Sequence, residues 1–66
     1  MEYTNSQIKA LILEHIHNAD DRKMLYLRLV DGMTFEQIAF KFGMTTKTVR
    51  TRIHRQETIL FKHLPG

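Results

Sequence analysis

Cysteine and tryptophan are absent from this sequence of 66 residues, which has only one proline and three glycines. Without cysteine there is no disulfide and no thiolate ligand for zinc, so stability rests on a small apolar core. Apolar runs are no longer than residues 10–13, whereas a helix needs about 20 apolar residues to span a membrane. Glu2 stands where a signal peptide has basic residues. We therefore expect one small soluble domain in the cytoplasm, without a membrane segment or a deep cofactor cleft.

Charge is distributed unevenly along the chain. Residues 1–33 carry four basic and five acidic side chains, whereas residues 34–66 carry six basic and two acidic ones. No acidic residue lies between Glu36 and Glu57. A segment with this excess of one sign repels itself unless it faces an anion. The pattern fits either a solvated basic helix or a surface that contacts nucleic acid.

The spacing of apolar residues predicts an all-α fold, because no segment alternates as a half-buried strand does. Thr4 or Asn5 can cap the first helix, and the carboxylate of Asp20 can cap the second. The second helix is apolar around most of its circumference, which predicts a central position in the fold. The predicted helices span about residues 6–17, 20–31, 35–42 and 46–62.

The third and fourth predicted helices have the plan of a helix-turn-helix motif. Thr34 and Gln37 have the spacing of a capping box, and Thr45 or Thr46 can cap the next helix. Gly43 lies in the short turn between the two helices, where a positive φ is expected. We therefore predict that the whole chain forms a single helix-turn-helix domain, with a three-helix core and an additional N-terminal helix.

The outer side of the fourth predicted helix is rich in hydrogen-bond donors. At about 100° per residue, Val49, Ile53 and Leu60 face inward. The opposite side then carries Lys47, Thr51, His54, Arg55, Thr58 and Lys62, with Arg50 on one flank and Thr48 and Arg52 on the other. The major groove of DNA admits a helix and presents guanine acceptors that match a guanidinium. The pattern therefore favours double-stranded DNA over a merely solvated surface.

The segment from about residue 20 to residue 62 resembles region 4 of bacterial sigma factors, most closely the small extracytoplasmic-function type. The resemblance is carried by residues 21–39, by residues 42–44 and, most specifically, by the order Thr-Val-Arg-Thr-Arg-Ile-His-Arg at residues 48–55. Regulators of the LuxR type share the four-helix plan and a similar last helix, and they are the second resemblance.

The resemblance implies a sequence-specific transcription regulator whose last helix reads an upstream promoter element and whose domain touches RNA polymerase. The implied base contacts are Arg50, Thr51, His54 and Arg55. Phosphate contacts are expected from Thr34, Thr45, Thr46, Lys47 and Arg52. The sequence departs from the family where Gln56 interrupts the inward stripe. It also lacks a region 2, so a complete sigma factor is not expected unless the chain is an excerpt.

Nothing in the sequence favours an enzyme. His15 and His17 point to different sides of a helix, whereas zinc needs convergent ligands. Asp20 and Asp21 fit a helix cap better than a catalytic pair, and Ser6 has no glycine elbow beside it. We therefore expect no catalytic residue, metal site, cofactor or small-molecule substrate.

Four apolar residues keep a second hypothesis open, an interaction module on the same scaffold that binds RNA polymerase or a sigma or regulator partner. They are Leu13, Phe40, Ile59 and Phe61. Phe40 lies away from the apolar face of its helix, and we expect it to pack under the N-terminal helix, with a partner contact as the alternative. Because one helix-turn-helix unit contacts a single half-site, a homodimer or docking on another protein is also expected.

Overall fold

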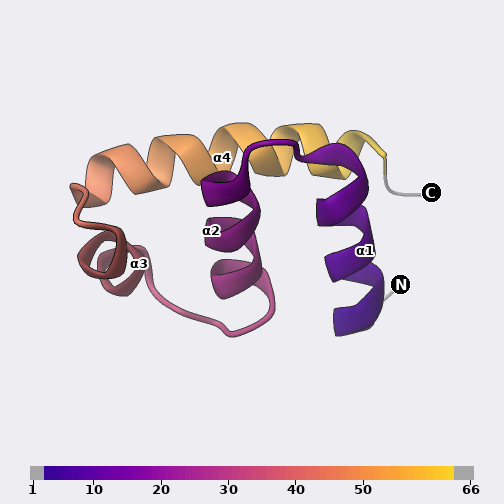
Figure 1. Cartoon of the computed structure of the whole chain (residues 1–66), viewed down its shortest axis with the longest axis horizontal. Coiled ribbons are helices and arrows are strands. Elements are labelled where there is room, and N and C mark those ends of the chain that lie inside the picture. Colours follow the sequence, from indigo (N-terminus) through magenta and orange to yellow (C-terminus); the bar gives the residue numbers. More distant parts are fainter. Residues whose placement is uncertain (1–2, 64–66) are drawn as a thin grey trace.

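The computed structural model describes residues 3–63, which form four helices and no strand. In Figure 1, α4 runs across the C-terminal end of α1 and the N-terminal end of α2, which lie side by side. Helix α3 lies beside α2 at the N-terminal end of α4. Within the described part, α1 and α3 do not touch each other. The predicted all-α class is confirmed. The helices are α1 (Asn5–His15), α2 (Ala19–Leu29), α3 (Phe35–Phe42) and α4 (Thr46–Lys62).

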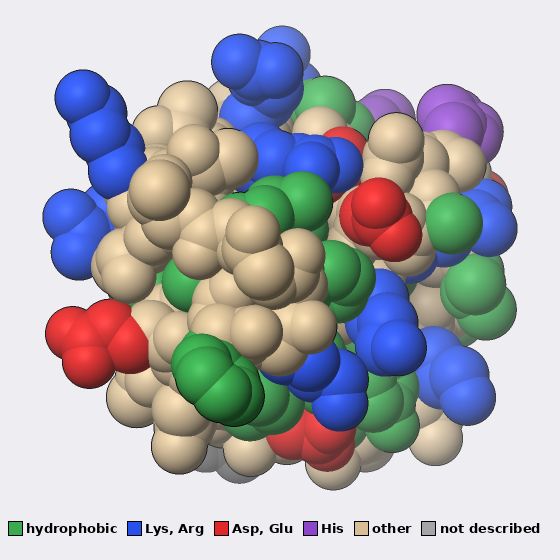
Figure 2. Space-filling view, turned by 60° about the vertical axis from the view of Figure 1, so that its left-hand side comes forward, with side chains coloured by type: hydrophobic (Ala, Val, Ile, Leu, Met, Phe, Trp, Pro, Cys, Tyr) green, Lys and Arg blue, Asp and Glu red, His purple; other side chains and the backbone are tan. Residues whose placement is uncertain are grey.

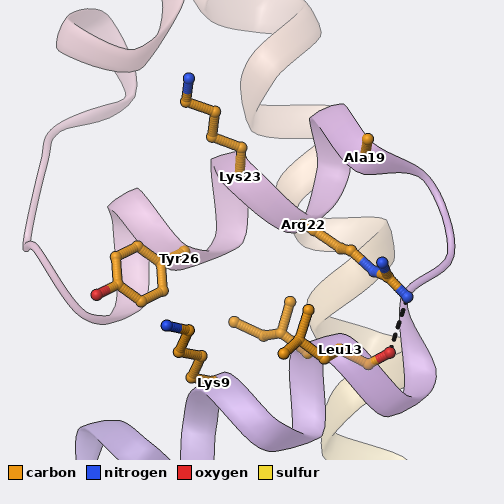
Figure 3. A pocket seen from close by; sticks show the side chains of 7 residues that line it. Lys9, Leu13, Ala19, Arg22, Lys23 and Tyr26 are labelled. Carbon is orange, nitrogen blue, oxygen red and sulfur yellow. Dashed lines mark hydrogen bonds between the residues drawn. The ribbon is translucent and has the colours of Figure 1, made fainter.

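The first two helices differ from their predicted bounds because tertiary packing ends α1 early. Ile16 has an extended backbone (φ −109°, ψ 119°), and its side chain is buried in the core. The predicted cap at Asp20 is wrong: the Asn18 side chain accepts the backbone N–H of Asp21 at 3.1 Å and begins α2. Arg22 holds the end of α1, since its guanidinium donates to the carbonyl oxygen of Leu13 at 2.8 Å (Figure 3) and to that of Ile16.

The helix-turn-helix segment has its predicted bounds, because its caps are local. Thr34 Oγ1 accepts the N–H of Gln37 at 3.1 Å, and the Gln37 side chain accepts the N–H of Thr34 at 2.9 Å. Gly43 ends α3 with φ 65° and ψ 33°, a left-handed conformation that glycine adopts without a Cβ penalty. Thr45 caps α4 by accepting the N–H of Thr48 at 3.2 Å. Local chemistry therefore fixes the turn that positions α4.

The core lies where α4 crosses the other helices. Val49, Ile53 and Leu60, which the pattern placed inward, are each almost completely buried. They pack in one cluster with Met24, Leu25 and Ile38 among others. Ala39 is also buried, which allows α3 to approach its neighbours closely. Because this apolar stripe faces the core, the opposite side of α4 faces solvent.

Candidate nucleic-acid interface

The exposed side of α4 is cationic and rich in hydrogen-bond donors. Figure 2 shows Lys and Arg side chains that project from the upper part of the molecule, where α4 lies. The outer face of α4, as we define it, consists of Lys47, Arg50, Thr51, His54 and Arg55, all of them exposed. These residues include the four predicted base contacts, and the structure brings them together on one side of one helix.

Most of this outer face is free to bind a ligand. Within residues 3–63, the side chains of Lys47, Thr51 and Arg55 have no hydrogen bond or ion pair. The His54 ring faces Glu57, with Nδ1 and Oε1 4.0 Å apart. Arg50 has its guanidinium carbon 5.6 Å from the centre of the Phe35 ring. The donors of the outer face are therefore almost all available to an external acceptor.

The N-terminus of α4 adds a second source of positive potential. Its first turn contains no acidic residue, whereas the first turn of α3 contains Glu36. The partial positive charge of a helix N-terminus attracts anions, and Lys47 lies beside it. Thr45 and Thr34 are exposed caps, and Thr46 is half-buried in the first turn of α4. The start of α4 is therefore the better placed of the two N-termini for a phosphate.

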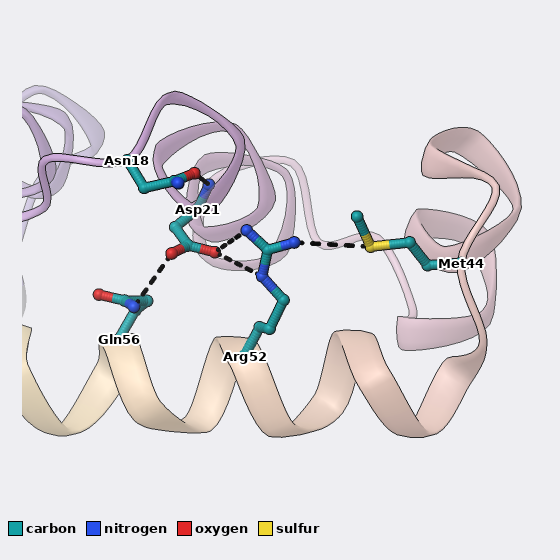
Figure 4. Close-up of polar contacts among 5 residues, drawn as sticks. All are labelled: Asn18, Asp21, Met44, Arg52 and Gln56. Atoms are coloured by element: carbon teal, nitrogen blue, oxygen red, sulfur yellow. Dashed lines mark hydrogen bonds and ion pairs between the residues drawn. The ribbon is translucent and has the colours of Figure 1, made fainter.

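Arg52 has an intramolecular role that the sequence did not indicate. Its Nε and Nη2 atoms lie 2.9 and 2.8 Å from Asp21 Oδ1, and Nη1 lies 3.8 Å from the sulfur of Met44 (Figure 4). Gln56 donates to the other carboxylate oxygen of Asp21 at 3.1 Å. We name Asp21, Arg52 and Gln56 the α2–α4 polar cluster. Since this cluster occupies the guanidinium of Arg52, we leave Arg52 out of the proposed phosphate contacts.

Gln56 has a structural role in the polar cluster. Asp21 is the one charged residue among residues 3–63 that is buried, and two donors from α4 satisfy its carboxylate. The amide at position 56 is therefore part of the contact between α2 and α4, rather than a defect in the apolar stripe. Sequence reasoning read Asp21 only as part of a helix cap, because its partners lie 31 and 35 residues away.

The histidines of the described part lie apart from one another, except for one stacked pair. The rings of His15 and His63 are stacked with centres 3.8 Å apart, and His17 is exposed. The described residues contain no group of three or more His, Cys, Asp or Glu side chains arranged to hold a metal ion. None of the described helices has the length and apolar character that crossing a membrane requires.

Comparison with known proteins identifies the family. The model of the family Sigma-70, region 4 matches residues 18–55, more than half of the chain. The chain belongs to the Sigma-70 region 4 family. The match includes α2, α3 and the part of α4 that carries the outer face, and it ends at Arg55. No curated protein and no solved structure gave a significant match. Region 4 domains bind DNA and RNA polymerase. The family and the exposed donors of the outer face of α4 therefore both favour DNA binding.

Proposed function

We propose that this region 4 protein is a sequence-specific DNA-binding regulator of transcription, and that α4 enters the major groove. The observation that carries the proposal is the outer face of α4, a set of exposed donors with almost no intramolecular partners, at the end of a helix-turn-helix unit. We expect the protein to act in the cytoplasm, in the compartment that contains the DNA.

Each proposed base contact has a chemical reason. Arg50 and Arg55 carry guanidinium groups, which can donate two parallel hydrogen bonds to O6 and N7 of guanine. Thr51 lies between them and is short, so α4 can approach the base edges or a thymine methyl group closely. His54 can donate a hydrogen bond from its ring. All four side chains are exposed on one side of α4.

The proposed phosphate contacts surround this set. Lys47 and the N-terminus of α4 can bind one phosphate, because Lys47 belongs to the first turn, whose partial positive charge attracts anions. Thr34, Thr45 and Thr46 lie at the N-termini of α3 and α4, where hydroxyl and backbone donors can fix the position of the domain along the duplex. These contacts supply affinity without reading the sequence.

Binding to DNA is expected to weaken steeply as salt is raised. Each neutralised phosphate contributes a slope of about −0.9 in a plot of log affinity against log salt, so two or three contacts predict a loss of about 10- to 40-fold between roughly 50 and 200 mM. Fluorescence anisotropy with a duplex selected from a random pool measures this dependence. An affinity that stays constant over that range, or a selection that enriches no duplex, would contradict the proposal.

A second candidate function is binding to a protein partner, and the exposure of Phe40 favours it. The expectation that Phe40 packs under the N-terminal helix is wrong, because α1 and α3 do not touch in the described part and the Phe40 side chain is 91% exposed. Leu13, Ile59 and Phe61 are also exposed, but they lie on α1 and the C-terminal half of α4. Leu13 borders an apolar hollow of about 250 Å³ between α1 and α2 (Figure 3). We propose RNA polymerase as this partner, with a homodimer as the alternative.

Replacing Phe40 with alanine tests this second function. Because an exposed aromatic ring that becomes buried in an interface is often a main source of binding energy, Phe40→Ala is expected to weaken binding to purified bacterial RNA polymerase at least about tenfold. The neighbouring exposed residue supplies the control, and Lys41→Ala should leave the affinity within about twofold. Surface plasmon resonance measures both, and circular dichroism checks the fold. Equal affinity of Phe40→Ala and the parent for the polymerase would exclude Phe40 from that interface.

A further inference from the structure

The ring of Phe35 lies among cationic side chains from two other helices. Phe35 is the first residue of α3 and is half-buried against the core. The guanidinium carbon of Arg28, on α2, is 4.5 Å from the ring centre, and that of Arg50, on α4, is 5.6 Å away. The ring of His54 is 5.8 Å away and tilted by 54°. Three helices thus meet at this one aromatic side chain.

Two of the residues around Phe35 are proposed base contacts. Arg50 and His54 lie one turn apart on α4 and are exposed, whereas Phe35 is half-buried against the core. Arg28 differs from them, because its Nη1 donates to the backbone carbonyl of Met33 at 3.0 Å and is held within the fold. The ring therefore has a fixed neighbour on α2 and two neighbours on α4 that point toward solvent.

An aromatic ring can hold an arginine in place without consuming its hydrogen-bond donors. The negative face of the ring attracts the guanidinium, and the planar group can rest on it while its N–H groups stay free. A long side chain that is already oriented loses less conformational entropy when it binds, so both affinity and discrimination between bases improve. Arg50 has no hydrogen bond or ion pair within the described residues, and its guanidinium carbon lies within the distance of about 6 Å at which a ring attracts a cation.

We infer that Phe35 is a positioning residue that orients Arg50 and His54 toward the bases and thereby sets the sequence specificity of the domain. The inference rests on the proposed DNA-binding function, and it adds a residue of α3 that touches no base to the residues that determine specificity. Phe35 also packs on the core. Its test therefore needs a readout that a loss of packing alone would not change.

The first readout needs no DNA. A ring current shifts the resonances of protons above an aromatic ring, so the Cδ protons of Arg50 are expected to move toward random-coil values in Phe35→Leu and to stay shifted in Phe35→Tyr. Nuclear magnetic resonance of the free protein measures this. Cδ resonances of Arg50 that are the same in the parent and in Phe35→Leu would overturn the inference, because the ring would then not hold the side chain.

The second readout is the discrimination ratio. It divides the affinity for the selected duplex by the affinity for a second duplex, which differs from the first only at the base pair that Arg50→Ala no longer distinguishes. Phe35→Leu is expected to lower this ratio about 3- to 10-fold, and Phe35→Tyr to retain it. Ile38→Val, a change in the buried part of the same helix, is the control for lost packing and should leave the ratio unchanged. In an Arg50→Ala background, Phe35→Leu should have no further effect on the ratio.

The outcomes separate this inference from the proposed function. If the parent binds one duplex selectively and Phe35→Leu keeps the same ratio, Phe35 has no positioning role and the DNA-binding function stands. If the parent selects no duplex, the proposed function fails and the specificity role of Phe35 fails with it. Should Phe35→Leu prove unfolded by circular dichroism, Phe35→Met replaces it, because its flexible side chain fills a similar volume without an aromatic face.

Discussion

Arg50→Ala is expected to cost about 1–3 kcal/mol of binding free energy for the selected duplex, which is about 5- to 150-fold in affinity, and to relax the preference at one base pair. The reason is that a guanidinium that donates to O6 and N7 of guanine distinguishes this base from the other three. Arg50 is exposed and has no hydrogen bond or ion pair among residues 3–63, so its replacement is expected to leave the fold intact. Anisotropy titrations with duplexes that differ at single positions measure both effects.

Lys47→Ala is the matched control for this prediction. Lys47 is also exposed on α4, and its replacement by alanine also removes one positive charge. A phosphate contact carries no sequence information, so Lys47→Ala should weaken all duplexes about equally and reduce the salt slope by about 1. If Arg50→Ala and Arg55→Ala bind every duplex as tightly as the parent does, the assignment of base contacts to α4 is wrong.

Asp21→Ala is expected to lower the free energy of unfolding by about 2–3 kcal/mol, because the change leaves the part-buried guanidinium of Arg52 without its carboxylate. The side chains of Asp21 and Arg52 are 10% and 27% exposed, so water replaces the lost bonds only in part. In a domain of this size a loss of about 1 kcal/mol lowers the melting temperature by about 4–8 °C, so a decrease of roughly 8–24 °C is expected. Thermal unfolding followed by circular dichroism measures it.

The neighbouring aspartate separates the polar cluster from the helix dipole. Asp20 and Asp21 both lie in the first turn of α2, where a negative charge stabilises the helix, but Asp20 is exposed. Asp20→Ala should therefore lose only the dipole contribution, about 0.3–1 kcal/mol. Equal losses in the two variants would show that the contacts of Asp21 with Arg52 and Gln56 contribute nothing beyond the dipole.

The sequence predicted those parts of the fold that depend on neighbouring residues. The bounds of α3 and α4 agree with the prediction because Thr34 and Gln37 form a capping box and Gly43 adopts the left-handed conformation. The end of α1 could not be read in this way, because Ile16 leaves the helix in order to reach the core, and this depends on where α4 lies. Local signals identified the caps of α3 and α4 but not that of α2, where Asn18 rather than Asp20 is the cap, and the burial of a single side chain depends on the whole fold.

In the candidate site, too, the local pattern could be predicted from the sequence, whereas contacts between distant residues could not. Helical periodicity alone placed Val49 and Ile53 in the core and so identified which side of α4 is exposed. The role of Arg52 could not be predicted, since the acceptor that it faces is 31 residues away in the sequence. The neighbours of Phe35 were not predicted either, because Arg28 and Arg50 come from helices on both sides of it in the chain. Whether these residues act on DNA remains a prediction for the experiments above.

The polar cluster has a consequence for the direction in which α4 presents its side chains. Aliphatic residues such as Val49 and Ile53 tolerate a modest rotation of one helix against another, because their contacts have little directionality. The two oxygens of Asp21 bond Arg52 and Gln56 at once, and a turn of α4 about its own axis would separate these groups and leave a buried charge unpaired. Electrostatics on the hidden side of this helix therefore sets the angular orientation of the residues on its visible side.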